Sequence, residues 1–322
     1  MRIEFPGLFD LQVNGFAGVD FNAPDLRTEH VNVALDRMRA VGVTRVLPTL
    51  VTSSFDGFAA SAAVLAAMSD PAIAGIHMEG PYISPEDGAR GAHPRPFTRT
   101  ASTDDFDRRQ DAARGRIVLV TLAPEVPGAL ALVEYLVARG VRVAIGHTAA
   151  SPAQIADAVA AGATLSTHLG NGCASVLPRH PNVIWEQLAA DALAATFIVD
   201  GHHLPAATVK ALVRAKSIAR SILVTDATAA AGCAPGRYRI GAIECDLGTD
   251  GRVSLAGTPY LAGSSLTLDR AIANTVRFTG LPIEAVTPMA STIPAQSLGL
   301  STAGTVTAEW DAERCDLRIL TT

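Results

Sequence analysis

The sequence has no long apolar run and no surplus of basic residues, and both absences exclude classes of protein. Its longest apolar stretches, such as GALALVEYLVARG and AAVLAAM, are far shorter than a bilayer span and carry or flank polar groups. The net charge of -5 and the pI near 5.9 leave no basic surface to attract nucleic acid or an anionic membrane. Neither is therefore expected as a partner.

Cysteine is also scarce, and the chain has no secretion signal at its start. The four cysteines lie far apart in no Cys-x-x-Cys pattern, which favours free thiols in a reducing compartment: Cys173, Cys233, Cys245 and Cys315. The first residues, MRIEFPGLFD, lack the apolar core of a signal peptide. The sequence therefore predicts a cytoplasmic protein.

What the sequence does contain is a regular alternation of short strands and helices. Eight runs rich in Val, Ile and Leu, closed by Gly, Pro, Asp or Thr, predict strands at 8–15, 43–51, 72–80, 116–125, 142–148, 164–170, 195–201 and 221–227. Helical patterns lie between them, as at 151–162, where Ser151 is the expected N-cap and Gly162 the stop. Eight such units favour a (β/α)8 barrel, and the lack of a Gly-x-Gly-x-x-Gly loop after the first strand argues against a dinucleotide fold.

Two segments depart from this alternation. Residues 237–255 alternate in polarity and turn at GTDG, so we expect an antiparallel hairpin there. The end of the chain also has the pattern of short strands. The predicted fold is α/β: a TIM-like barrel over residues 1–302 with the hairpin 237–255 inserted, and a reduced β appendage at 303–322.

Polar side chains end the predicted strands, and this end of such a barrel carries the active site. The residues concerned are Gln12, Asn14, Glu79, His147, His168, Asn171, Asp200, His202, His203 and Asp226. A carboxylate and two imidazoles that converge from different strands are the usual ligands of a catalytic zinc or similar ion. They leave one position for water, whose pKa the metal lowers to about 7. Asp226 is placed to accept the proton of that water and to deliver it to a leaving amine.

Each of these residues also has a structural interpretation. A single histidine at a strand end is more often a packing residue, and only the whole set favours His168 as a ligand. Glu79 could cap a neighbouring helix, but a nearly buried carboxylate in an apolar strand needs a strong partner. Asp226 could cap the helix that begins after it.

Other histidines remain open at this point. His77 precedes Glu79 by two residues, so both point to the same side of their strand. His77 therefore either lines the lower part of the site or packs in the barrel. Only one of His202 and His203 should face the site, and spacing alone does not choose between them.

Together, the motifs HMEGP, GHT, THLGNG, DGHH and LVTDATAAAG, with PGLFDLQVNG at the start, resemble those of N-acetylglucosamine-6-phosphate deacetylases in the amidohydrolase superfamily. The likeness covers residues 6–305, and the motifs occur in family order. It implies Glu79, His147 and His168 as metal ligands and Asp226 as the catalytic acid and base. It further implies a small-molecule amino-sugar substrate and, by the family's habit, a homodimer.

The resemblance also assigns residues to the substrate. In the family's Asp-Gly-x-His motif the histidine contacts substrate, which selects His203 over His202. Asn171 and Gly172 match an Asn-Ala pair that contacts substrate after the third ligand. His93, in GAHP, matches the histidine of the family's Gly-Thr-His-Asn-Pro loop close to the active site.

The sequence departs from the family pattern at three places. Gln12 and Asn14 replace the His-x-His that holds a second metal in most amidohydrolases, and neutral amides are poor ligands for zinc or iron. One divalent ion per chain is therefore expected, zinc before iron, cobalt or manganese, with Gln12 and Asn14 lining the site. After the third ligand the chain reads GCASVLPRHPNVIWEQLA, where Arg179 or His180 would take the place of the family's phosphate-binding arginine. Family members begin several dozen residues earlier with sandwich strands, so we interpret 303–322 as a remnant of that sandwich.

The sequence thus predicts a metal-dependent deacetylase that converts N-acetylglucosamine 6-phosphate to glucosamine 6-phosphate and acetate. The metal would polarise the acetamide carbonyl, and His203 would help to hold it. The alternatives are an amidohydrolase for another N-acyl or cyclic amide, a non-catalytic sugar-binding relative, and a metal-free barrel lyase. Metal content separates the last from the others, and acetate release separates the rest.

Overall fold

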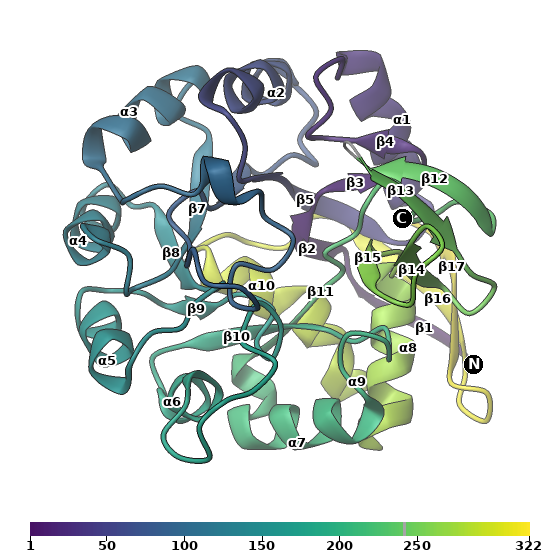
Figure 1. Cartoon of the computed structure of the whole chain (residues 1–322). Helices are drawn as coiled ribbons and strands as arrows, with labels where there is room; N and C mark the ends of the chain where they lie inside the picture. Colours follow the sequence, from purple (N-terminus) through teal and green to yellow (C-terminus); the bar gives the residue numbers. More distant parts are fainter. Residues whose placement is uncertain (241–242) are drawn as a thin grey trace.

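The computed structural model describes residues 1–240 and 243–322, and an eight-stranded parallel sheet lies at its centre (Figure 1). In spatial order the strands are β2 (Leu8–Val13), β5 (Val43–Val51), β6 (Ile76–Glu79), β7 (Ile117–Leu122), β8 (Arg142–Ile145), β9 (Leu165–Ser166), β10 (Ala194–Ile198) and β11 (Ser221–Val224). Every neighbouring pair in this order is parallel. The predicted (β/α)8 barrel is confirmed.

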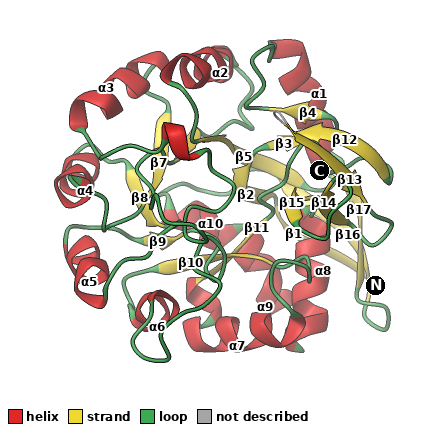
Figure 2. Cartoon of the chain, in the orientation of Figure 1, coloured by secondary structure: helices red, strands yellow, loops and turns green. Residues whose placement is uncertain are grey.

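Helices connect successive strands and surround the sheet (Figure 2). They are α1 (Thr28–Arg39), α2 (Phe55–Ala67), α3 (Thr103–Ala112), α4 (Ala129–Ala138), α5 (Pro152–Ala160), α6 (Val183–Ala189), α7 (Ala206–Lys216), α8 (Leu268–Thr279), α9 (Ile283–Val286) and α10 (Thr292–Ser297). Short 3₁₀ helices occur at Arg95–Phe97, Ile218–Arg220 and Thr287–Ala290. Helix α5 begins as predicted, because the Ser151 side chain accepts from the Gln154 amide and Gln154 completes a capping box. Among the described residues, no helix is long and apolar enough to cross a membrane.

The barrel strands are buried on both faces, since helices cover one face and packed side chains fill the other. Strands β2, β6 and β11 contain only buried residues. Most predicted strands were nevertheless too long at their carboxyl ends. The largest error was at 164–170, where only Leu165–Ser166 form β9. The polar residues that follow each strand leave the ladder and form the loops of the barrel mouth.

Smaller sheets lie beside the barrel. The predicted hairpin 237–255 is part of a four-stranded antiparallel sheet of β12 (Gly236–Ile240), β13 (Ile243–Leu247), β14 (Arg252–Leu255) and β15 (Leu261–Ser264). Residues 241–242 lie outside the described residues. The predicted antiparallel hairpin with its turn at 248–251 is confirmed, because β13 and β14 pair antiparallel on either side of that turn. Strands β12 and β15 extend it on both sides, which the local pattern did not reveal. Two further short strands, β3 (Gly15–Phe16) and β4 (Val19–Asp20), pair antiparallel.

The two ends of the chain meet in a third sheet. Strand β1 (Arg2–Pro6) pairs antiparallel with β16 (Thr305–Asp311), which pairs antiparallel with β17 (Asp316–Thr321). Phe5, Val306, Ala308, Trp310 and Leu317 join the core of the barrel. The predicted C-terminal strands are therefore present, and the first residues of the chain complete their sheet.

The barrel closes between its first and last strands. Strands β2 and β11 stand at opposite ends of the sheet order, and an isolated bridge joins Val13 to Ala227 just beyond them. The Asp226 amide donates to the Gln12 carbonyl at 2.9 Å, and the Asn14 amide donates to the Ala227 carbonyl at 2.8 Å. We call this junction of β2 and β11 the barrel seam. It lies where predicted site residues from both strands meet.

Candidate metal centre

Three of the predicted residues form one buried group at the mouth of the barrel. Glu79 ends β6, while His147 and His168 follow β8 and β9 by two residues. Their ligand atoms all lie within 4.8 Å of one another. The Glu79 Oε1 atom is 3.3 Å from the His147 Nε2 atom and 3.0 Å from the His168 Nε2 atom. The carboxylate and two imidazoles that the sequence predicts as one group therefore lie together in the structure.

The backbone at these strand ends is unusual. His147, His168 and Asp226 have φ angles of 48°, 29° and 48°, in the region that favours glycine. Each such angle turns the chain sharply out of its strand. Hydrogen bonds hold the turns, since Thr196 Oγ1 accepts from the His168 amide at 2.6 Å and the Gln12 carbonyl accepts from the Asp226 amide. Backbone strain of this kind costs about 1–3 kcal/mol per residue and is concentrated at functional sites.

Hydrogen bonds and charge together fit this group to a cation. The Ala89 carbonyl can only accept, so the His147 Nδ1 atom, 3.0 Å away, carries a proton and donates it. Its Nε2 atom is the ring nitrogen that faces the Glu79 carboxylate. Burial raises the pKa of Glu79, but the two histidines outweigh it and hold that pKa well below its usual range. Burial lowers the pKa of His168, but the hydrogen bond and the charge of Glu79 outweigh burial and raise that pKa above its usual value. The carboxylate thus attracts positive charge to the point where the three donor atoms meet.

Gln12 and Asn14 use their amide groups to hold acidic residues of the site. The Gln12 Nε2 atom donates to the Glu79 Oε1 atom at 2.8 Å, and the Asn14 Nδ2 atom donates to the Asp226 Oδ1 atom at 2.6 Å. Burial and the nearby Glu79 raise the pKa of Asp226 to about 6. A carboxyl group with a pKa near neutrality is suited to exchange protons with substrate.

His77 lies beneath the metal-binding group. Its Nδ1 atom is 3.1 Å from the Leu11 carbonyl oxygen, which can only accept, and its Nε2 atom is 2.7 Å from the Thr121 Oγ1 atom. The Thr121 hydroxyl is in turn 2.6 Å from that of Thr167. This chain of hydrogen bonds crosses the barrel interior from Leu11 in β2 to Thr167, just after β9. Of the two interpretations of His77, the geometry favours packing within the barrel.

His93 and His203 both lie close to acidic groups. The His93 Nε2 atom is 3.2 Å from the His147 Nε2 atom and 3.8 Å from the Glu79 Oε2 atom. The His203 Nδ1 atom is 2.6 Å from the Asp200 Oδ2 atom, whereas His202 reaches the Asp250 carbonyl with its Nε2 atom at 3.2 Å. Burial raises the pKa of Asp200, but the hydrogen bond and charge of His203 outweigh it and lower that pKa. His202 and His203 therefore point to different partners.

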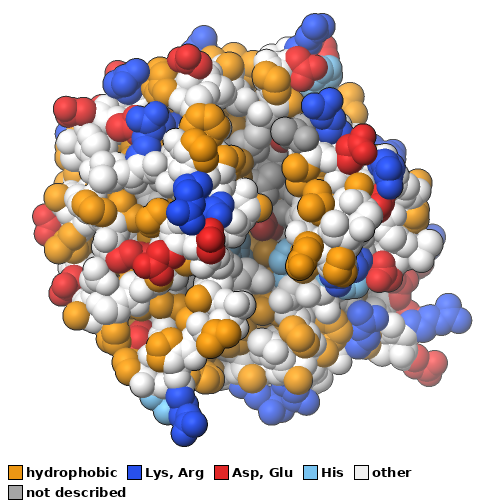
Figure 3. Space-filling view, viewed as in Figure 1, with side chains coloured by type: hydrophobic (Ala, Val, Ile, Leu, Met, Phe, Trp, Pro, Cys, Tyr) orange, Lys and Arg blue, Asp and Glu red, His pale blue; other side chains and the backbone are white. Residues whose placement is uncertain are grey.

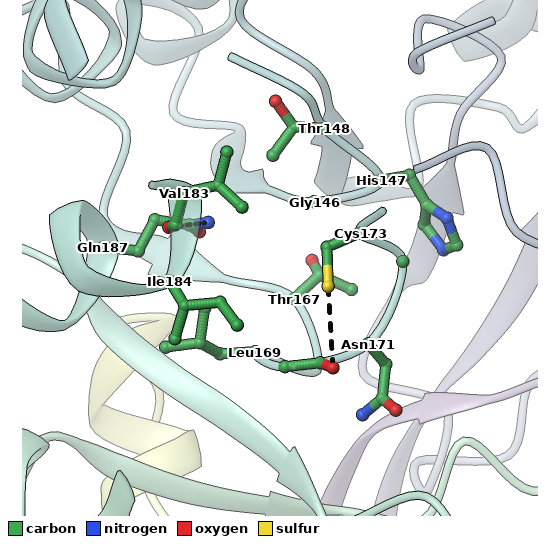
Figure 4. A pocket seen from close by; sticks show the side chains of 12 residues that line it. Gly146, His147, Thr148, Thr167, Leu169, Asn171, Cys173, Val183, Ile184 and Gln187 are labelled. Atoms are coloured by element: carbon green, nitrogen blue, oxygen red, sulfur yellow. Dashed lines mark hydrogen bonds between the residues drawn. The ribbon is translucent and has the colours of Figure 1, made fainter. Parts of the chain in front are cut away.

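Gly172 has a steric role that its sequence motif did not reveal. It has a φ of 57°, and a Cβ atom added there would lie 2.8 Å from the His147 Nδ1 atom. A Cβ atom on Gly91 would lie 3.0 Å from the Cε1 atom of the same ring. Two glycine backbones thus form a narrow slot for the His147 imidazole. Figure 4 shows this ring beside the loop that carries Asn171 and Cys173.

Arg179 lies outside this group. Its side chain is exposed and forms no hydrogen bond or ion pair within the described part of the chain. The neighbouring His180 is also exposed. Figure 3 shows a hollow near the middle of the face that carries the barrel mouth, with acidic and histidine side chains visible in it. The four cysteines are free, as predicted.

Two contributors to the site were not predicted from the sequence. Thr52, just after β5, places its Oγ1 atom 2.9 Å from the His93 Nδ1 atom. Asp10 is 1% exposed and receives hydrogen bonds from Gln12 and Thr225. A signal for Asp10 was present, because a carboxylate inside the apolar run LFDLQV needs a partner. Thr52 carried no comparable signal.

Comparisons with known proteins agree with this architecture. Residues 3–313 match the sequence profile of the Amidohydrolase family. The chain is 36% identical over 316 residues to human N-acetylglucosamine-6-phosphate deacetylase, covering 93% of this chain and 75% of that protein. It is 35% identical over 304 residues to N-acetylgalactosamine-6-phosphate deacetylase from Escherichia coli O157:H7, covering 92% and 78%. A crystal structure of an aspartate-to-alanine variant of the Mycobacterium smegmatis N-acetyl-D-glucosamine-6-phosphate deacetylase, in complex with N-acetyl-D-glucosamine-6-phosphate, superposes with a TM-score of 0.89. That pair is 30% identical, and the match covers 99% of this chain and 86% of that one.

Proposed function

Since this chain belongs to the amidohydrolase family, we propose that it hydrolyses N-acetylglucosamine 6-phosphate to glucosamine 6-phosphate and acetate. The observation that carries this proposal is the buried group of Glu79, His147 and His168, with Asp226 beside it at the barrel mouth. Amide hydrolysis needs an activated carbonyl, a deprotonated water and an acid for the leaving amine. The residues at the mouth can meet these three needs.

We propose that Glu79, His147 and His168 hold one divalent ion, most suitably zinc, with iron, cobalt or manganese as alternatives. One carboxylate and two imidazoles are a frequent catalytic zinc set. When bound, the ion supplies Lewis acidity toward a carbonyl oxygen and a water molecule. Gln12 and Asn14 favour a single ion over two, because neutral amides are poor ligands. The Gln12 amide already donates to Glu79, and the Asn14 amide donates to Asp226.

Asp226 is the proposed acid and base. Its raised pKa lets the ionised form accept a proton from the attacking water, and the protonated form then delivers it to the departing nitrogen. Asn14 fixes the orientation of the carboxyl group through the 2.6 Å hydrogen bond to Oδ1. This orientation is needed because the same carboxyl group first accepts a proton from the attacking water and then donates it to the leaving amine.

His203 is proposed to hold the acetamide carbonyl oxygen. The Asp200 Oδ2 atom, 2.6 Å from the His203 Nδ1 atom, fixes the orientation of the imidazole. We therefore infer that the Asp200–His203 pair directs the other ring nitrogen, Nε2, toward the developing oxyanion.

We propose that the sugar-binding site is lined by Asn171, Gly172 and His93, and that Arg179 binds the phosphate group. A planar guanidinium matches a phosphate dianion well, and the exposed Arg179 side chain has no competing partner among the described residues.

The 4-epimer, N-acetylgalactosamine 6-phosphate, is a second candidate substrate because a relative that acts on it shares 35% identity with this chain. The deciding experiment measures acetate release from both 6-phosphates and from both sugars without phosphate, using metal-loaded protein. The proposal predicts that N-acetylglucosamine 6-phosphate has the highest kcat/KM. A preference for the 4-epimer would reassign the sugar, and no acetate from any of the four would overturn the deacetylase function.

A further inference from the structure

The barrel seam has an unusual construction directly below the site. Strand β2 pairs in parallel with β5, but the register shifts between Asp10 and Val13, so the regular ladder is interrupted around Gln12. Side-chain oxygen atoms accept the backbone amide protons there in place of the ladder. The Val13 amide donates to the Thr49 Oγ1 atom at 3.0 Å, and the Gln12 amide donates to the Asp10 Oδ1 atom at 3.2 Å.

The Asp10 carboxyl group also crosses the seam to the last strand. Its Oδ1 atom accepts from the Thr225 amide at 3.3 Å, and its Oδ2 atom accepts from the Thr225 hydroxyl at 2.6 Å. Asp10 is 1% exposed, so these partners replace water almost completely. One side chain therefore bonds to a residue of β2 and to the residue that immediately follows β11, the two strands that close the barrel.

The two residues bonded by Asp10 lead directly to the proposed catalytic groups. Gln12 accepts from the Asp226 amide through its carbonyl and donates to Glu79 through its side chain at 2.8 Å. Thr225 immediately precedes Asp226 in the chain. A shift of either strand at the seam would thus displace the acid and base and one metal ligand together.

We propose that Asp10 is a positioning residue, whose carboxyl group closes the barrel seam and fixes the relative places of Gln12, Glu79 and Asp226. It acts through Gln12 and Thr225, and no hydrogen bond joins it to Asp226 or to the metal-binding group within the described residues. The inference rests on the proposed function, since that function makes Glu79 a ligand and Asp226 the acid and base.

The choice of residue supports this role. Burial raises the pKa of Asp10 to about 7, although bonds from Thr225 and Gln12 act in the opposite direction. A group that only filled space at this position would be better apolar, because a buried carboxyl group is costly unless its partners need it. In either protonation state Oδ1 can accept the two amide protons.

The test compares Asp10→Leu, Asp10→Asn and Thr225→Val. Leucine has a similar size but leaves two amides and one hydroxyl without their acceptor. Asparagine retains an Oδ1 acceptor for both amides. Thr225→Val removes the hydroxyl, which besides its bond to Asp10 donates to the Gln12 carbonyl at 3.4 Å and accepts from the Ala227 amide at 3.2 Å. We measure kcat and KM for N-acetylglucosamine 6-phosphate, and independently the affinity for Zn²⁺ by chelator competition on folded protein.

The proposal predicts an order of severity. Asp10→Leu should lower kcat at least 100-fold with KM changed less than fivefold, and should weaken Zn²⁺ binding about tenfold through Gln12 and Glu79. Asp10→Asn should retain activity within about tenfold, and Thr225→Val should fall between these two variants. If Asp10→Leu does not fold, the order of the other two still tests the idea, since a stronger defect in Asp10→Asn than in Thr225→Val contradicts it.

Two results would overturn the inference. The first is a folded Asp10→Leu protein with normal kcat and normal Zn²⁺ affinity, because Asp10 would then serve stability alone. The second is a loss of thermal stability in all three variants with unchanged kinetics. If the wild-type protein releases no acetate, the proposed function fails, while Zn²⁺ affinity still reports on the seam by itself.

Discussion

The hydrogen bond from Gln12 to Glu79 should control how tightly the protein holds its metal. Gln12→Leu removes the amide donor and keeps a side chain of similar size in the same buried position. The lost bond is short, at 2.8 Å, and its acceptor is the Oε1 atom that also faces both histidines. Without it, Glu79 loses the contact that fixes the orientation of this oxygen.

The expected magnitude follows from two independent scales. A hydrogen bond to a charged group contributes about 1.5–3 kcal/mol to stability. Loss of a partner that orients a metal ligand typically weakens affinity about 10- to 100-fold, which corresponds to about 1.4–2.7 kcal/mol. The two ranges overlap, so the Kd for Zn²⁺ should rise 10- to 100-fold in Gln12→Leu.

Asn14→Leu is the matched control. It removes an amide bond of 2.6 Å from the same strand end, but that bond reaches Asp226 and no member of the metal-binding group. Chelator competition should therefore find near-normal Zn²⁺ affinity in Asn14→Leu, with a marked loss of kcat. Equal weakening of Zn²⁺ binding in both variants, or a change below threefold in Gln12→Leu, would refute the reasoning.

Four further predictions follow from the same geometry. Elemental analysis after dialysis should give about one divalent ion per chain, and two tightly held ions would contradict the role given to Gln12 and Asn14. Asp226→Asn should lower kcat by a factor of about 10² or more at near-normal metal content, whereas wild-type turnover would remove Asp226 from the mechanism. Arg179→Ala should raise KM for the 6-phosphate sugar about tenfold and leave the unphosphorylated sugar almost unaffected; equal effects on both sugars would exclude a phosphate contact. The pKa of Asp10 is about 7 in the folded protein and 3.8 in the unfolded chain, so the folded state binds more protons between these pH values. Asp10 should therefore make the free energy of unfolding fall as pH rises toward 7. Denaturant titrations of Asp10→Asn should show a flatter pH dependence, and an unchanged slope would disprove this contribution.

The sequence was sufficient for the barrel and for placing Glu79, His147 and His168 together at its mouth. Eight apolar runs can bury their backbones only in a covered parallel sheet, and polar groups at the ends of such strands need partners. The strand ends themselves were predicted too long, because β propensity does not reveal the positive φ angles at His147 and His168. Those turns exist only because tertiary hydrogen bonds hold them.

Contacts between distant residues were not predictable. Asp10 and Thr225 are 215 positions apart, so no local pattern pairs them. The fourth strand of the small antiparallel sheet was missed for a similar reason, since β15 is also held by a bridge from Ser264 to Ala227 at the barrel seam. The steric role of Gly172 likewise depends on His147, which lies on another loop.

The left-handed backbone at His147, His168 and Asp226 has a consequence for engineering this protein. Glycine is the residue that these angles favour, so a glycine at any of the three relieves backbone strain but removes a side chain that the proposed chemistry requires. A design scored only on backbone geometry would therefore favour inactive variants at these very positions. Design protocols for thermostable forms should hold these three codons fixed and seek their gains elsewhere, for example on the exposed faces of the outer helices.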